Sequence, residues 1–191
     1  MAHFQEGILS FEFGLSWHGK VCKFNEHRDY KKVVQGVEET KGVDFLGILK
    51  GRLYFIEVKD YRGRVFEKDR LLLEVSQKVR DSVACIIAAY QTSSEPEFWQ
   101  PYAELLLNRQ RPIRVVLWLE RDVSLMPRRG SKRRESEKLS KLREARKGVR
   151  DADLKRKLRW LTSQVAIGSL NESEWSGLDC RVRSVSRTAT P

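Results

Sequence analysis

The stretch VDFLGILKGRLYFIEVKD, from Val43 to Asp60, decides the fold because it reads as a tight β-hairpin. Two largely apolar segments flank Lys50-Gly51, which a two-residue turn would place at the tip of the hairpin. In the register set by that turn, Asp44 lies directly opposite Glu57 on the neighbouring strand. The hairpin is therefore expected to bring two carboxylates face to face.

Two opposed carboxylates need a compensating positive charge. Directly opposed residues of an antiparallel pair have Cβ atoms about 4.5–5.5 Å apart, and like charges at that distance destabilise the sheet. A bound divalent cation between Asp44 and Glu57 would offset the repulsion, and Lys59 follows on the same face of the strand. These residue types together predict a hydrolytic site for metal-dependent cleavage of nucleic acid. The alternative is that Glu57 and Lys59 are solvated where the sheet ends, with Lys59 neutralising Asp44.

The second strand of the hairpin has the character of an inner strand. Residues Leu53 to Val58 are apolar on both faces, as expected of a strand that is covered on both sides. Glu57 and Lys59 then interrupt one face near the end of the strand. Charged groups at such a place are costly unless they are paired or bound to an ion, so they predict a cleft or an ion pair.

Length and composition favour a single domain over residues 1–191, because a chain with 40% hydrophobic residues can bury one sizeable core. We expect a core at about 20–125, a basic helical segment at about 128–161 and C-terminal strands at about 164–186. The predicted elements are, in chain order, strands at Gly7–Gly14 and Lys20–Phe24 that border the sheet, a helix from Glu26 to about Gln35 or Glu39 with Asn25 as its N-cap, the hairpin, a helix from Asp69 to about Gln91, a short helix at Pro101–Asn108, and strands at Ile113–Leu119, Gln164–Gly168 and Cys180–Ser186. This alternation predicts an α/β fold with a mixed central sheet flanked by helices.

The cysteines and the apolar runs indicate the cellular compartment in which the protein is expected and whether it is expected in a membrane. Cys22, Cys85 and Cys180 are odd in number and show no zinc-ligand spacing, which favours a reducing cytoplasm over a disulfide framework. The N-terminus lacks a basic region of the kind that opens a signal peptide. The longest wholly apolar run, Val83 to Tyr90, is too short to span a bilayer, so no membrane role is expected.

The net charge of +11 is concentrated in residues 128–159, which hold 15 Lys and Arg against 5 Asp and Glu. The rest of the chain has 22 against 21 and is nearly neutral. Such a segment attracts a phosphate backbone through counterion release, so we expect nucleic acid as the partner. The contacts expected in this segment are Arg133, Arg134, Lys155 and Arg156. The alternatives are a solvated helical face, or basic helices that dock on an acidic protein surface.

A strand-borne Asp44, a turn, and an apolar strand that ends in Glu57-Val58-Lys59 resemble the core of the PD-(D/E)XK nuclease superfamily. Within that superfamily the chain is most similar to small bacterial members of unassigned biological role. The resemblance implies a restriction-endonuclease-like core of the order αβββαβ and endonuclease-like hydrolysis of nucleic acid, with DNA as the expected substrate. It also implies Mg²⁺ or Mn²⁺ as the cofactor. Cutting both strands of a duplex takes two sites, so a homodimer is compatible with this activity.

Carried over by position, the resemblance assigns Asp44 and Glu57 as the two acidic metal ligands and Lys59 as the catalytic lysine. Val43 stands where the name of the family has a proline, which removes no ligand. The main-chain carbonyl of Val58 is the expected third oxygen ligand, since hard cations take oxygen atoms. Lys59 should remain protonated beside two carboxylates and stabilise charge on the phosphate rather than act as a base.

Members of the superfamily often add residues from the two helices that flank the hairpin. The first helix offers a carboxylate, for which the candidates are Glu26, Asp29, Glu38 and Glu39. The helix after the hairpin offers Gln77 or Lys78, unless these residues only face solvent. Arg62 and Arg64 follow the site directly and are expected either to hold flanking phosphates or to be ordinary loop cations. The main alternative function is a catalytically inactive nucleic-acid-binding module that retains the nuclease fold.

Overall fold

The computed structural model describes residues 1–18, 20–63, 67–110, 112–121, 152–170 and 177–185. The elements along the chain are β1 (Ala2–Glu6), β2 (Leu9–Phe13), the 3₁₀ helix η1 (Leu15–Trp17), β3 (Val21–Lys23), the 3₁₀ helix η2 (Phe24–Glu26), α1 (Arg28–Gly36), β4 (Phe45–Leu49), β5 (Arg52–Tyr61), α2 (Lys68–Thr92), α3 (Pro96–Leu107), β6 (Arg114–Arg121), β7 (Val165–Gly168) and β8 (Cys180–Ser184). Residues 152–158 form a further short helix.

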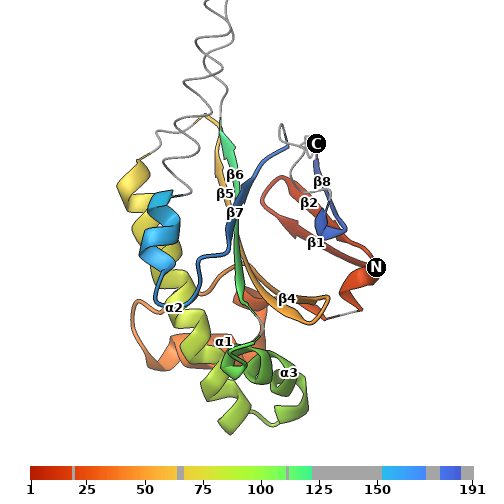
Figure 1. Ribbon diagram of the computed structural model, residues 1–191, viewed down its shortest axis with the longest axis vertical. Helices are drawn as coiled ribbons and strands as arrows, with labels where there is room; N and C mark the ends of the chain where they lie inside the picture. Colours follow the sequence, from red (N-terminus) through yellow and green to blue (C-terminus); the bar gives the residue numbers. More distant parts are fainter. Residues whose placement is uncertain (19, 64–66, 111, 122–151, 171–176, 186–191) are drawn as a thin grey trace, which may run out of the picture.

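The strands form two sheets. The larger sheet has the order β3-β4-β5-β6-β7, with antiparallel pairing from β3 to β5 and parallel pairing from β5 to β7. The smaller sheet has the order β1-β2-β8 and is antiparallel. The helices α1, α2 and α3 lie on one side of the larger sheet and the smaller sheet lies on its other side (Figure 1). The predicted α/β class with a mixed sheet is confirmed, but within the described residues the α-helices cover one face of that sheet and the small sheet covers the other.

The hairpin forms in the predicted register. Leu49 pairs with Arg52 across the turn, and the pairing continues to Phe45 opposite Ile56, so that the next pair along is Asp44 and Glu57. Both turn residues have positive φ, 51° at Lys50 and 67° at Gly51, which is the conformation of a type I′ turn. That turn matches the right-handed twist of the two strands and fixes their register.

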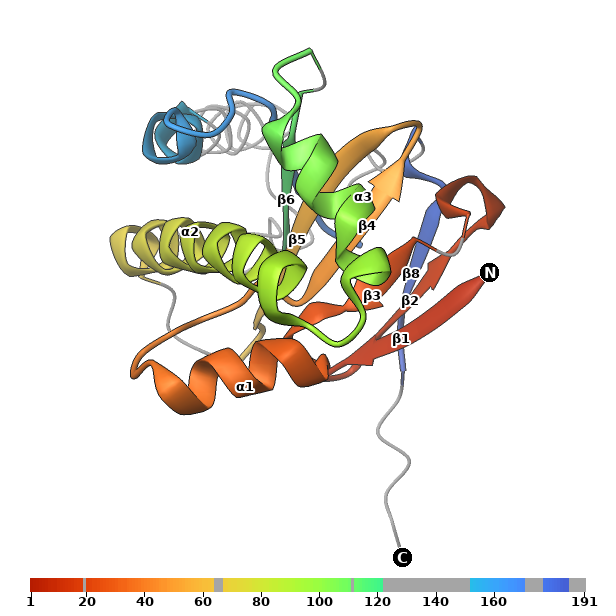
Figure 2. The ribbon, with the colours of Figure 1, turned by 90° about the horizontal axis from the view of Figure 1, so that it is seen from below.

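Strand β5 is covered on both faces, as its sequence predicts. Leu53 and Phe55 belong to the core beneath the helices, where they share a cluster with Val75 and Val79 of α2. The alternate residues of β5 point the other way, into a second cluster that contains the apolar residues of β2. Figure 2 shows α1, α2 and α3 on one side of β4 and β5 and the small sheet on the other.

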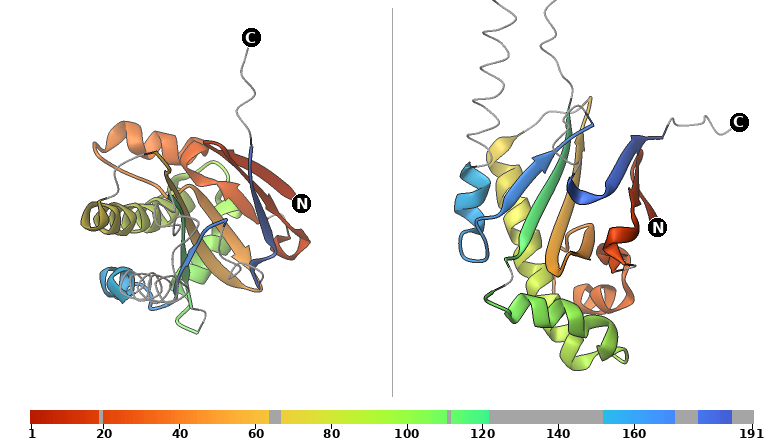
Figure 3. Two further views of the ribbon diagram at one scale, coloured as in Figure 1. Left: turned by 90° about the horizontal axis from the view of Figure 1, so that it is seen from above. Right: turned by 45° about the vertical axis from the view of Figure 1, so that its right-hand side comes forward.

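The small sheet corrects the expectation that the Gly7–Gly14 strand borders the central sheet. Strand β2 is instead the middle strand of the small sheet, and Leu9, Phe11 and Phe13 are fully buried against Phe45 and its neighbours. The view on the right of Figure 3 shows this sheet standing apart from β5 and β6. Strand β8 completes it from the far end of the chain, whereas β7 extends the larger sheet beside β6.

The starts of the three α-helices also differ from expectation. His27, not Asn25, is the N-cap of α1, and its Nδ1 accepts a hydrogen bond of 3.2 Å from the backbone N–H of Asp29. Helix α2 begins at Lys68, so Asp69 lies in its first turn, where a negative charge is favourable, and is not its cap. Helix α3 begins at Pro96. Pro101, at which the helix was predicted to begin, lies inside it.

Part of the predicted basic segment falls outside the described residues. Arg133, Arg134 and the rest of 128–151 lie outside those residues, and so does Arg64, which follows the hairpin. The described portion of the segment, 152–158, is helical and packs Leu154 and Leu158 into the core beneath the helices.

Candidate active site

Asp44 lies immediately before β4, with its carboxylate held at two points and only 4% of the residue exposed. Its Oδ2 accepts a hydrogen bond of 2.6 Å from the backbone N–H of Val58, and its Oδ1 accepts one of 2.9 Å from Nδ2 of Asn25. Burial raises the pKa of Asp44. The charge of Lys78 and the hydrogen bond from the Val58 N–H act in the opposite direction but do not cancel this shift. The carboxylate is therefore fixed in position and partly shielded from water.

Glu57 is fully buried on the face of β5 that looks toward α2. Its Oε1 lies 2.7 Å from Nζ of Lys78 and 3.2 Å from Nζ of Lys59. These contacts are ion pairs, since neither carboxylate oxygen accepts a hydrogen bond of normal geometry within the described residues. Burial first, and then the charge of Asp44, raise the pKa of Glu57 to about 8 despite the two lysines. The two carboxylate oxygens of Glu57 can therefore still bind a cation or accept a hydrogen bond.

Lys59 sits between two carboxylates. Its Nζ donates a hydrogen bond of 2.7 Å to Oε1 of Glu74 and lies 3.2 Å from Oε1 of Glu57. Burial alone lowers the pKa of Lys59, but the negative charges of Glu57 and Glu74 outweigh it, so the net shift is upward. Lys59 is thus held as a cation, and its electrostatic role on the phosphate stays a prediction.

Helix α2 supplies both partners that close the site. Lys78 reaches the carboxylates, with its Nζ 2.7 Å from Glu57 and 3.9 Å from Oδ1 of Asp44, whereas Gln77 makes no hydrogen bond with them. Glu74 lies one turn earlier, and sequence reasoning missed it. The available signal was the spacing of Glu74 and Lys78, which are four residues apart and flank the buried stripe of Val75 and Val79.

The first-helix carboxylates do not reach the site. Glu26 is exposed and pairs with Lys23 at 2.6 Å. Asp29 is buried, but its Oδ2 accepts hydrogen bonds from Nε1 of Trp99 and Oγ of Ser93. Glu38 and Glu39 are exposed beyond the end of α1. In place of these acids, Asn25 of η2 contacts Asp44, because η2 precedes α1 and lies beside the start of β4.

The remaining predicted residues lie around the site without joining it. Arg62 makes a two-pronged contact with Asp60, from Nε to Oδ1 at 2.9 Å and from Nη2 to Oδ2 at 2.6 Å. Lys155 and Arg156 are exposed on the helix at 152–158. That helix is tied to the start of α2 by an ion pair between Lys68 and Asp153.

The site offers the oxygen atoms that a hard cation prefers, but it does not contain a preformed group of three ligating side chains within the described residues. Among the residues that the structure describes, no group of three or more His, Cys, Asp and Glu is placed to hold a metal. Asp44 and Glu57 nonetheless supply carboxylate oxygens, and Mg²⁺ commonly binds one or two carboxylates and keeps several waters. The contact seen at Val58 comes from its N–H, and its carbonyl as a ligand stays a prediction.

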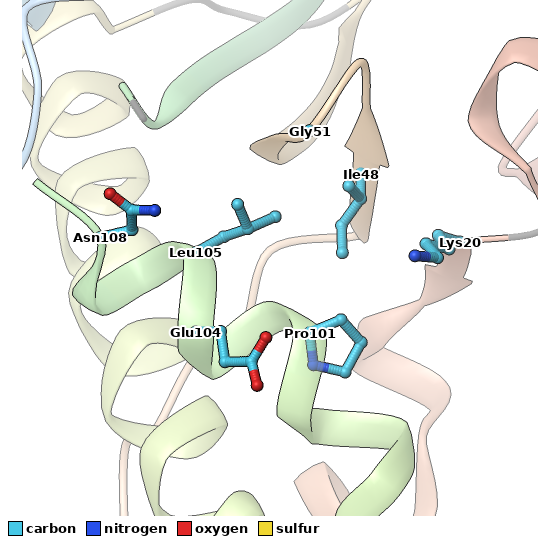
Figure 4. Close-up of a pocket in the computed structure, with 7 residues that line it drawn as sticks. All are labelled: Lys20, Ile48, Gly51, Pro101, Glu104, Leu105 and Asn108. Atoms are coloured by element: carbon cyan, nitrogen blue, oxygen red, sulfur yellow. The ribbon is translucent and has the colours of Figure 1, made fainter. Parts of the chain in front are cut away.

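A separate hollow of about 310 Å³ lies beside the hairpin turn, between β4 and α3 (Figure 4). Its lining is Lys20, Ile48, Gly51, Pro101, Glu104, Leu105 and Asn108. Glu104 is already engaged, because its Oε1 accepts a hydrogen bond of 2.7 Å from Gln100. Asp44 and Glu57 are not among its lining residues, since they lie at the open end of the hairpin, away from the turn.

No family model, curated protein or solved structure matches this chain significantly. Within the described ranges, no helix combines the length and apolar character that crossing a bilayer requires. The geometry around Asp44 and Glu57 is accordingly the basis for assigning a function.

Proposed function

We propose that the chain is a metal-dependent nuclease that hydrolyses phosphodiester bonds of nucleic acid, with DNA as the expected substrate. The observation that carries this proposal is the juxtaposition of two buried carboxylates, Asp44 and Glu57, with a protonated Lys59 on the same side of β5. Glu57 is a buried acid that accepts no hydrogen bond within the described residues, which is costly for a protein, and a bound cation offsets that cost.

The order of elements supports assignment to the PD-(D/E)XK type. Helix α1, the β4–β5 hairpin, helix α2 and strand β6 follow one another along the chain, and the candidate residues lie where β5 leaves the buried part of the sheet. One difference from the expected αβββαβ core is that the described residues between α1 and α2 form two strands, while β3 precedes α1. The small sheet formed by β1, β2 and β8 is an addition to that core.

In the proposed mechanism, each residue of the site has a distinct task. Asp44 and Glu57 would hold Mg²⁺ or Mn²⁺, which supplies an activated water and neutralises charge on the scissile phosphate. The Val58 N–H and the Asn25 amide fix the orientation of Asp44. The ammonium group of Lys59 stabilises negative charge that builds up on the phosphate oxygens in the transition state.

Two residues of α2 contact Lys59 and Glu57 and hold them in place. Glu74 accepts a hydrogen bond from Lys59 and so keeps its ammonium group aimed between the carboxylates. Lys78 pairs with Glu57 and prevents two negative charges from facing each other unscreened when no ion is bound.

A specific observation favours a second candidate, the inactive nucleic-acid-binding module. Lys59 and Lys78 already place two positive charges on Glu57, so the cluster is neutralised to a large extent by the chain itself. In this alternative the lysines take the place of the metal. Lack of affinity for Mg²⁺ and Mn²⁺ at millimolar concentration would favour it.

The proposal is tested by incubating supercoiled plasmid with the purified chain in Mg²⁺, Mn²⁺ or EDTA. We expect metal-dependent nicking that is lost in Asp44→Ala and in Lys59→Ala. The matched control is Glu120→Gln, because Glu120 is a buried acid of the adjacent strand β6 whose Oε1 accepts the Leu170 N–H. We expect the control to cleave like the unmodified chain. Cleavage by both alanine variants at the unmodified rate, or a folded chain that cleaves with neither ion, would refute the assignment.

A further inference from the structure

A basic surface with an exposed tryptophan lies on the segment that packs beside α2 on the same face of the large sheet. We call it the basic platform and define it as the exposed cations and the exposed tryptophan of 152–160. They are Lys155, Arg156, Lys157, Arg159 and Trp160. The inner side of the same segment is apolar, since Leu154 and Leu158 are fully buried. The spacing of four between these leucines places both on the inner face of the helix and leaves Lys155, Arg156 and Lys157 exposed, and Arg159 and Trp160 are exposed in the turn that follows.

The platform is fixed to the body of the protein. Asp153 forms an ion pair with Lys68 at the start of α2, and Figure 3 shows the segment beside that helix. At the other end, Oγ1 of Thr162 donates a hydrogen bond of 2.6 Å to the carbonyl of Ile113. The segment that carries the platform is therefore attached to the body of the protein at both of its ends.

Its positive charge is largely unneutralised. The nine residues 152–160 contain four cations and one acid, Asp153, which is shared between Lys68 and Arg156. Lys155, Lys157 and Arg159 form no ion pair with the residues in the described ranges. A surface of this sign, in a chain with a net charge of +11, attracts polyanions.

Trp160 is the feature that a merely solvated helical face does not explain. It is 54% exposed, whereas Trp17, Trp99 and Trp118 are each at most 3% exposed. Trp160 lies in the turn that follows the helix, directly after Arg159 and within the same basic run. An exposed aromatic side chain next to a run of exposed cations is the combination that stacks a nucleic acid base while the cations hold the flanking phosphates.

We propose that the basic platform binds a single-stranded segment of nucleic acid, with an unpaired base stacked on Trp160. A duplex keeps its base faces stacked on each other, so it would engage only the cations. The inference rests on the proposed function in one respect, the choice of nucleic acid over an acidic protein as the partner. The platform also lies near the site, because Lys68 and Glu74 are about 9 Å apart along the axis of α2.

The test measures binding of a labelled oligothymidylate by fluorescence anisotropy in EDTA, where no cleavage occurs. We expect Trp160→Ala to weaken binding about 5- to 150-fold and Trp160→Phe to retain most of it. Removing Lys155 and Lys157 together as alanines should also weaken binding and reduce its dependence on salt. The control is the double alanine variant of Lys31 and Lys32, which removes the same charge from exposed positions of α1.

Duplex DNA of the same length separates stacking from simple charge attraction. We expect Trp160→Ala to bind the duplex as tightly as the unmodified chain does. We also expect the variant protein to have the same melting curve by circular dichroism, which controls for folding. An unaltered affinity of Trp160→Ala for the oligothymidylate, or an equal loss for the duplex, would overturn the proposal. Binding that does not weaken between about 50 and 200 mM salt would overturn it in favour of an acidic protein partner. If the plasmid assay fails while the Trp160 effect persists, the hydrolysis proposal is wrong and the platform stands.

Discussion

Replacing Glu57 with glutamine should change how the stability of the protein depends on pH. Glutamine is a neutral substitute of nearly the same shape, so it mimics the protonated carboxyl group at every pH. In the folded state the pKa of Glu57 is raised from its ordinary value of 4.5 to about 8, first by burial and then by the charge of Asp44. The unfolded chain therefore releases this proton at lower pH than the folded chain does, and the unmodified protein loses stability as pH rises.

The size of the effect follows from the two pKa values. One unit of pKa corresponds to 1.36 kcal/mol. Stability from this group is fully present below pH 4.5, declines as pH rises, and stops declining above about pH 8. Integrated between pH 5 and pH 9, the loss in the unmodified protein is roughly 4 kcal/mol, and Glu57→Gln should escape it.

The measurement is urea denaturation of both proteins in EDTA at several pH values between 5 and 9. The quantity of interest is the difference in free energy of unfolding between variant and unmodified protein, since contributions from groups that do not interact with Glu57 cancel in it. We expect the difference to shift in favour of Glu57→Gln by roughly 4 kcal/mol over this range. A difference that stays constant with pH would show that the lysines keep Glu57 ionised and would refute the reasoning.

Three further predictions concern the surroundings of the site. Glu74→Gln removes the charged partner of Lys59, so we expect the rate of plasmid nicking at saturating Mg²⁺ to fall about tenfold or more, with the melting temperature as the control for folding. Asp29→Ala leaves the indole N–H of Trp99 without its acceptor, and we expect a loss of about 2–3 kcal/mol in urea denaturation; a loss below 0.5 kcal/mol would contradict this. His27 caps α1 through a neutral ring nitrogen, and burial lowers its pKa, so capping is complete above pH 6.5 and is lost as pH falls through the lowered value. Asparagine caps a helix without titrating, so the melting temperature of His27→Asn should fall less on acidification than that of the unmodified chain. An equal fall in both proteins would contradict the capping role of His27.

The hairpin and its register were predictable because they depend on neighbours in sequence. A turn of two residues and strict alternation of side chains fix which residues face each other, and the pairing that places Asp44 opposite Glu57 follows from them. The inner position of β5 was likewise readable from its apolar residues on both faces. The mutual position of the two acids and Lys59 thus needed no knowledge of distant contacts.

Features that depend on distant contacts were not predictable in this way. The small sheet joins β2 to β8, whose residues lie near opposite ends of the chain, and no local pattern encodes that pairing. Glu74 enters the site only because α2 packs on the sheet with one particular rotation, which sequence periodicity does not specify to within one residue. Asn25 was expected to cap a helix, but its amide is used by Asp44 instead, since a 3₁₀ turn displaces the helix start to Arg28.

Metal binding measured by isothermal titration calorimetry tests the central claim most directly, that Asp44 and Glu57 share one divalent cation. Titration of Mn²⁺ in buffers of different ionisation enthalpy should show one ion per chain and release of protons at pH 7, because the pKa of Glu57 is raised to about 8 and Glu57 must lose its proton to bind. Proton release should be smaller at pH 9 than at pH 7, and Asp44→Asn should abolish binding. A folded chain that binds neither Mn²⁺ nor Mg²⁺ at millimolar concentration, or that binds them equally well after Asp44→Asn, would contradict the account.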